Sequence, residues 1–258
     1  MPPGVLWVEG MGLQFPAGSI VVSIGADGLP HAEVKTTLVR LDLWPTWLEI
    51  GCAHAARAAE VANQLRSDAI DDESKGNLLT QELQQAIVAI TAFAFAFDGF
   101  YDVVRHELGQ HPDADNWRVH RTARHKQITE TLRYHLKLGP KCTAHLRSFV
   151  KDLLNFRGRA VHPSSRFVEA NWRPDIDCAV HPQFITFSGP HAVQARALAL
   201  TMLDQLLDRA QELAKPGSET GWLDRGRREL DRLIPIYRIP GDDVLAFAED
   251  IAQHEAPT

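Results

Sequence analysis

Two hydrophobic patterns follow one another along the chain. Before residue 45, short β-branched and partly alternating runs predict strands at Val5–Val8, Ser19–Ile24 and Ala32–Leu43. The turn-forming stretch Gly25–Pro30 separates the second strand from the third. We therefore expect a small β-meander at the N-terminus, which serves as a lid or as an interaction element.

From residue 46 onward the apolar positions recur every three to four residues, which is the period of an α-helix. A polar break is expected at Glu73–Asn77 and a loop at Gly109–Asp115. The alternating segment Ala92–Phe97 resembles a strand, but the helical pattern on both sides favours a helix. One later strand is predicted at Phe184–Phe187. The predicted helices are Trp47–Ser67, Leu79–Val104, Val119–Leu138, Lys141–Phe156, His191–Lys215, Trp222–Leu233 and Asp242–His254.

These patterns predict a mainly α-helical protein with three regions. They are an N-terminal β region (1–45), a helical bundle (46–217) and short C-terminal helices (218–258). The chain has 258 residues, of which 45% are hydrophobic, and it can therefore bury a sizeable core without metals or disulfides. The longest apolar run, Ala86–Phe97, is shorter than the roughly 20 residues that cross a bilayer. We expect a buried helix there and no membrane partner.

The cysteines indicate a reducing compartment. Cys52, Cys142 and Cys178 are odd in number and widely spaced, which does not fit a disulfide framework. The segment Met1–Gly4 has neither the basic nor the apolar region of a secretory signal. The expected location is the cytoplasm.

Metal and cofactor motifs fit poorly. His106 and His111 are five residues apart, whereas two zinc ligands on one helical face are four apart. A second arrangement pairs Cys142-x-x-His145 with Cys178-x-x-His181, at a spacing unusual for structural zinc. There is no glycine-rich phosphate loop. We therefore predict neither a metal site nor a cofactor.

Charge is unevenly distributed along the chain. The net charge is −6, yet Trp117–Arg166 contains 12 Lys or Arg against two acids, Glu130 and Asp152. That segment carries +10 (12 − 2), and the remainder carries −16 (−6 − 10). A long stretch of one sign indicates a patch for an anionic partner such as RNA. The alternative is a solvated basic face that pairs with the acidic remainder.

The basic segment contains a predicted helix that ends in Arg157-Gly158-Arg159-Ala160-Val161-His162-Pro163. The Arg157–His162 spacing alone is weak evidence, since similar spacings occur at two other places in the chain. Arg157, however, follows Val150 by seven residues and Leu153 by four, so it continues the apolar stripe of the helix. A charged side chain facing a packed seam is costly, which suggests a functional role.

The neighbours of Arg157 have distinct expected positions. Arg147, Lys151 and Arg159 fall on the outer face of the helix, where they are candidate phosphate contacts together with Arg166. The helix is expected to end near His162, because Pro163 disfavours helical geometry in the preceding residue. Gly158 would permit a left-handed cap or the close approach of another backbone.

The stretch Leu153–Pro163 resembles the HEPN superfamily (higher eukaryotes and prokaryotes nucleotide-binding), an all-α bundle with an Arg-x4–6-His motif near the end of a late helix. The resemblance covers about Leu78–Lys215. It implies a homodimeric, metal-independent endoribonuclease with a toxin or defence role and a possible antitoxin protein. An acidic residue near the motif would be Asp98 or Asp102. One departure is Gly158, where the family usually has a polar residue, often Asn.

The chemistry suits RNA, whose 2′-hydroxyl supplies the nucleophile. His162 would act as general base or acid, and Arg157 would bind the scissile phosphate and stabilise the transition state. Some aromatic side chains in or beside the basic segment would stack on bases, while most belong to the core. These residues are Trp117, Tyr134, Phe149, Phe156, Phe167 and Trp172.

Two alternatives remain open. The first is a catalytically inactive HEPN-like module that binds a nucleotide, an RNA or a partner protein, which the Gly158 departure and the acidic net charge favour. The second is a purely structural helical protein. In that case Arg157 pairs with a core acid, His162 only bonds at a helix end, and residues 1–45 form an interaction element.

Overall fold

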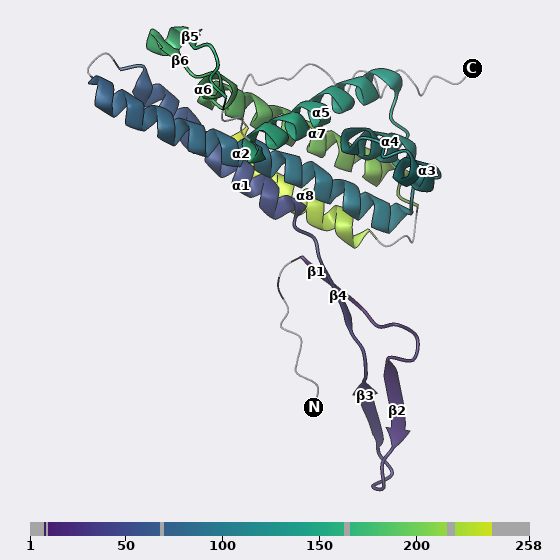
Figure 1. Ribbon diagram of the computed structural model, residues 1–258. Helices are drawn as coiled ribbons and strands as arrows, with labels where there is room; N and C mark the ends of the chain where they lie inside the picture. The colour runs from purple at the N-terminus through teal and green to yellow at the C-terminus, as the bar shows by residue number, and fades with distance from the viewer. Residues whose placement is uncertain (1–7, 9, 68–69, 163–165, 216–219, 239–258) are drawn as a thin grey trace. The chain divides into compact units, whose positions relative to one another are not determined.

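The computed structural model describes residues 8, 10–67, 70–162, 166–215 and 220–238 (Figure 1). The chain divides into two compact units, Met1–Leu43 and Trp44–Thr258. In the described residues the first unit contains only strands, and the second is mainly helical. The prediction of a mainly α-helical protein with a few small N-terminal strands is confirmed.

The strands of the first unit pair in a nested order. They are β1 (Met11–Gln14), β2 (Ile20–Ile24), β3 (Pro30–Val34) and β4 (Leu38–Leu41). β2 pairs antiparallel with β3, and β1 pairs antiparallel with β4. The predicted meander is therefore wrong, because a meander pairs each strand with the next one. Most of the strand predicted at residues 5–8 lies outside the described residues.

The turn between β2 and β3 forms where the sequence predicted it. The N–H of Gly25 donates to the carbonyl of Leu29 at 2.9 Å, and Gly28 has a φ of 75°. A positive φ of this kind costs glycine little, because it has no Cβ. The chain therefore runs out along β1 and β2 and returns along β3 and β4.

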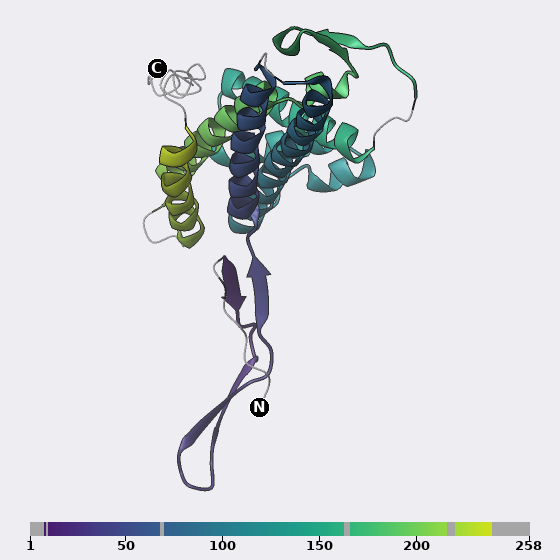
Figure 2. The ribbon, with the colours of Figure 1, turned by 90° about the vertical axis from the view of Figure 1, so that its left-hand side faces the viewer.

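The second unit is built around one long helix. α2 packs against α1, α4, α5 and α7, and α1 and α2 lie side by side in both views (Figures 1 and 2). Its side chains Phe93, Phe97 and Phe100 are fully buried in the main core. The α-helices are α1 (Trp44–Leu65), α2 (Asp72–Leu108), α3 (Ala114–Val119), α4 (Arg124–Leu136), α5 (Pro140–Val161), α6 (Gln183–Thr186), α7 (Gly189–Leu213) and α8 (Gly221–Tyr237).

The structure of α2 contradicts one prediction and confirms another. The predicted polar break at Glu73–Asn77 is wrong, because the helix begins at Asp72. The side chain of Asp71 accepts from the N–H of Ser74 at 2.8 Å and caps it. Ala92–Phe97 is helical, as predicted.

Within the described residues α2 alone is long and apolar enough to span a membrane, and 61% of its most apolar window is buried inside the structure.

The later part of the chain differs from the prediction at several points. The predicted helix Val119–Leu138 is interrupted before α4, and Arg121 has a φ of 49° there. The strand predicted at Phe184–Phe187 is wrong, because α6 occupies most of it and its neighbour Phe187 packs in the main core. Two short strands, β5 (Asn171–Arg173) and β6 (Cys178–Val180), were not predicted.

Two C-terminal helices were predicted, and the described residues include only the first of them. Leu223, Leu230 and Leu233 of α8 are buried in the same core as α1 and α7. α8 is thus part of the helical unit. The helix predicted at Asp242–His254 lies outside the described residues.

A buried ion pair fixes the start of α7. Arg173 and Glu82 are 4% and 1% exposed, and two bonds of 2.6 and 2.9 Å join their side chains. Glu82 also accepts from the N–H of Gly189 at 2.7 Å, and Arg173 also donates to Asp175. This network joins α2, β5 and α7, and it holds the start of α7 at one end of the bundle.

Candidate functional site

The candidate site lies at the end of α5. The helix continues past the predicted Phe156 to Val161, and His162 is its C-cap residue. Gly158 lies inside the helix without a positive φ, and nothing lies within 4 Å of a Cβ added there. Gly158 therefore forms no left-handed cap, and no backbone of the described residues approaches it closely. Pro163 lies outside the described residues.

Arg157 packs against α2. Its guanidinium carbon lies 4.9 Å from the centroid of the Phe95 ring, within the range of a cation–π contact. The side chain is half-buried, and among the described residues it has no carboxylate partner. The apolar stripe predicted this position correctly. The ring holds the cation in place and leaves its N–H donors available for a ligand.

His162 is less constrained. The residue is exposed, and its backbone N–H donates to the carbonyl of Gly158 at 2.9 Å. Within the described structure no hydrogen bond or ring contact joins its imidazole to Arg157 or to another side chain. A catalytic histidine normally has a partner that fixes its tautomer and orientation. In this single chain nothing described supplies one.

Arg159 reaches a region that the sequence did not indicate. Its Nη2 donates to the Thr186 hydroxyl at 3.2 Å, and the Nδ1 of His191 lies 3.1 Å from the Thr186 carbonyl. His191 is in the first turn of α7, at the positive end of that helix dipole. The fold thus places a second histidine near Arg159. No motif signalled it, because the two residues are 32 positions apart in sequence (191 − 159).

A group of basic side chains from α4 and α5 surrounds His125, near the start of α4. Burial, and then the positive charges of Lys151, Lys126 and Arg147, lower the pKa of His125. Cations from both α4 and α5 therefore lie close enough to His125 to lower its pKa. Lys126 and Lys151 have no carboxylate partner among the described residues. Part of the basic segment therefore forms a positive surface and does not pair with the acidic remainder.

Arg147 is partly neutralised. Its guanidinium pairs with the carboxylate of Glu130, which also accepts from Arg133 at 2.6 Å. Burial disfavours the Glu130 carboxylate, but the bonds and charges of these two arginines outweigh it and hold the pKa of Glu130 below its usual range. Two cations thus share one anion. Arg147 has less capacity for a phosphate than Lys151 or Arg159.

The acidic candidates lie in other ion pairs. Asp98 accepts from Arg124 at 2.7 Å, and Asp102 accepts from Arg105 at 2.5 Å. Neither carboxylate pairs with Arg157 in the described structure. Arg166 is exposed beyond the end of α5.

The aromatic residues divide into two groups. Phe149 is buried and Phe156 packs against the core, but Tyr134 is 48% exposed and Trp117 belongs to neither core cluster. The expectation that most of the six aromatic residues belong to the core is therefore wrong. Phe167 and Trp172 are 107% and 58% exposed. Among the described residues that come after His162 in sequence, these two are the exposed aromatic side chains.

The metal-binding residues do not cluster. In the described ranges no group of three or more His, Cys, Asp or Glu side chains gathers. Cys142 is buried, whereas His145 three residues later is exposed. The two side chains thus lie on different faces of α5, and the arrangement with Cys178 does not form.

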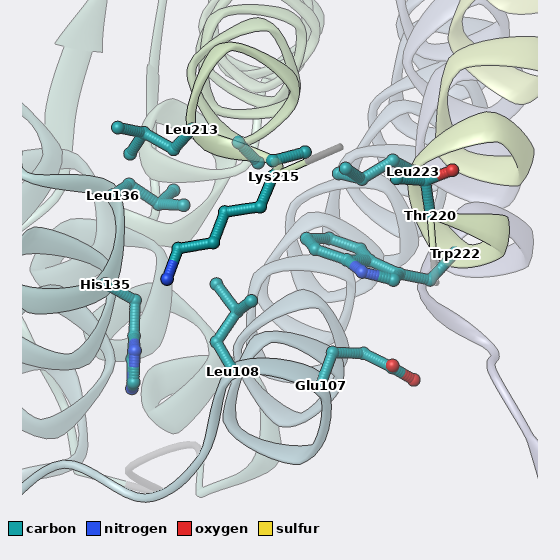
Figure 3. Close-up of a pocket in the computed structure, with 11 residues that line it drawn as sticks. Glu107, Leu108, His135, Leu136, Leu213, Lys215, Thr220, Trp222 and Leu223 are labelled. Atoms are coloured by element: carbon teal, nitrogen blue, oxygen red, sulfur yellow. The ribbon is translucent and has the colours of Figure 1, made fainter. Parts of the chain in front are cut away.

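A separate pocket of about 440 Å³ lies where α2, α4 and α7 end and α8 begins (Figure 3). Leu108, Leu136 and Trp222 form apolar walls, and the Lys215 side chain extends toward His135. Burial is the main cause of the lowered pKa of His135. None of the motif residues lines this pocket, so it is distinct from the site on α5.

Comparisons of the chain with models of protein families, with curated proteins and with solved structures found no match.

Proposed function

We propose that this protein is a HEPN-like, metal-independent endoribonuclease in which Arg157 and His162 act on RNA. The observation that carries the proposal is the state of Arg157. Its guanidinium is half-buried on Phe95 without a described carboxylate partner, at the end of a basic helix. A cation held in this way is available to a phosphate.

The chemistry follows from the groups available. Arg157 binds two oxygens of the scissile phosphate and stabilises the negative charge that develops there. His162 removes the proton of the 2′-hydroxyl or protonates the leaving oxygen. Lys151 and Arg159 lie eight residues apart on α5, or about 12 Å along its axis. They contact phosphates on either side of the cleaved bond.

The absence of an orienting group for His162 in the described single chain supports a homodimeric enzyme. In a site shared by two chains, the second copy supplies residues that the first lacks. A toxin or defence role, with an antitoxin protein as partner, extends the resemblance and belongs to the same proposal.

The test is cleavage of mixed RNA in EDTA by the wild type, Arg157→Ala and His162→Ala. Loss of a general acid or base costs roughly 10²–10⁴-fold in rate, and loss of an oxyanion-stabilising group costs about 10²–10³-fold. Arg228→Ala is the matched control, because Arg228 is an exposed arginine on α8. Cleavage that survives His162→Ala would remove the catalytic assignment.

A second candidate function is RNA binding without cleavage. It is favoured by Gly158, which offers no polar side chain. Because the space around Gly158 is open, Gly158→Asn fits there, and Gly158→Ala is its control. Saturable RNA binding by a wild type that does not cleave, with no gain in Gly158→Asn, would support the binding module.

A further inference from the structure

The N-terminal ribbon is formed by the pairs β1–β4 and β2–β3. Each pair has one apolar face and one face with polar side chains. Residues directly opposite in an antiparallel pair share one face, and successive residues alternate between faces. On β2–β3 the pairs Val21–Glu33 and Ser23–His31 form a face with several polar side chains. The opposite face is entirely apolar and consists of Ile20, Val22, Ile24, Pro30, Ala32 and Val34.

The β1–β4 pair also has one apolar face. On β1–β4, Met11 lies opposite Leu41, and Leu13 lies opposite Val39, so these four apolar residues share a face. The other face carries Arg40. Neither apolar face contains a charged residue, and the ribbon is therefore amphipathic along both of its strand pairs.

The apolar side chains of the ribbon are exposed. Val22 and Ile24 are 65% and 76% exposed, and 12 of the 21 large hydrophobic residues exposed in the described structure lie before Trp44. The other nine are spread between Val88 and Ile236. Neither hydrophobic core contains a described residue of the ribbon.

A two-stranded ribbon without a core is at best marginally stable in water. The apolar faces therefore need a cover, and their exposure indicates an interaction surface.

We propose that the apolar faces of the ribbon pack against the same faces of a second copy of this chain. Identical uncharged faces are self-complementary across a two-fold axis, so the contact closes into a dimer without charge repulsion. Seven of the large side chains on these faces are 36–76% exposed. The β2–β3 face alone, with Pro30 and Ala32, offers on the order of 500 Å² per chain, or about 1,000 Å² for the two chains, near the lower limit of a specific interface.

This contact goes beyond the proposed ribonuclease activity. It uses residues of the first unit and none of the α5 motif. It assigns the N-terminal ribbon the task of joining two chains, and it depends on neither Arg157 nor His162.

The first test is the mass of the full chain by sedimentation equilibrium. Ile24→Glu places an unpaired charge in the apolar face and should weaken dimerisation at least tenfold. Ile24 is mostly exposed in the single chain, so its substitution removes little intrachain packing. Ser23→Glu adds the same charge to the opposite face of β2 and should leave the dissociation constant unchanged within about twofold.

A second test does not depend on a destabilising variant. In a Cys178→Ser background, Val22→Cys should give a covalent dimer with a short bismaleimide, and Ser23→Cys should not. Cys52 and Cys142 are buried, and burial raises the pKa of Cys52 to about 12, so these thiols should not react.

The outcomes are separable from those of the RNA assay. A monomeric wild type at every concentration would overturn the ribbon dimer, as would a dimer that Ile24→Glu does not weaken. A dimer that Ile24→Glu does not weaken would leave the proposed enzyme untouched. A monomeric wild type would also remove the homodimeric part of the proposed function, and the cleavage assay in EDTA tests the roles of Arg157 and His162 separately.

Discussion

The buried pair between Glu82 and Arg173 gives the sharpest prediction about stability. Glu82→Gln keeps the side-chain volume, and it removes the charge that Arg173 meets at 2.6 and 2.9 Å. The amide also cannot accept at both of its ends, so Arg173 or the N–H of Gly189 loses its acceptor. Breaking a buried ion pair by removing one partner costs roughly 3–5 kcal/mol.

Two features of the structure refine this magnitude. Asp175 still accepts two bonds of 3.0 Å from Arg173, and the carbonyl of Phe184 accepts a third. Burial disfavours the Asp175 carboxylate, yet Arg173 outweighs it and holds the pKa of Asp175 below its usual range. Because Arg173 keeps this partner, we expect a loss near the lower end, about 3 kcal/mol.

The assay is urea unfolding at pH 7, followed by circular dichroism at the helical band. Glu212→Gln is the matched control, because Glu212 pairs with Arg209 at 2.8 Å but is 56% exposed. An exposed pair of this kind contributes about 0.5 kcal/mol or less. If Glu82→Gln costs no more than Glu212→Gln, the argument from burial is refuted.

Two further predictions concern pH and packing. Burial lowers the pKa of His111 from its ordinary 6.5, so the unfolded chain binds the proton more readily. Stability should fall as pH drops from about 7 toward 5. Because burial also lowers the pKa of His125 and His135, His111→Phe should remove only part of this dependence in melting curves. A Cβ on Gly189 would lie 2.6 Å from the carbonyl of Ala58, so Gly189→Ala should cost about 1–3 kcal/mol. Gly158→Ala, in open space, should be neutral or stabilising by up to ~1 kcal/mol; equal losses in the two variants would contradict this reasoning.

The sequence determined the features that depend on local periodicity. The helical period located the cores of the long helices, and the spacing from Val150 and Leu153 placed Arg157 against a packed neighbour. The turn at Gly25–Pro30 followed from residue types that favour a reversal. Each of these depends on residues a few positions apart, so the pattern is readable along one segment.

Only the tertiary structure decided which distant segments meet. The sequence did not indicate the partner of Glu82, because Arg173 is 91 residues away. The nested pairing of the four N-terminal strands was also not readable, because alternation fixes the faces of a strand but not its partner. Phe184–Phe187 became mostly helical because Phe187 is buried in a core formed by other helices. These outcomes depend on long-range packing, whose free energy exceeds the small local preference for helix or strand.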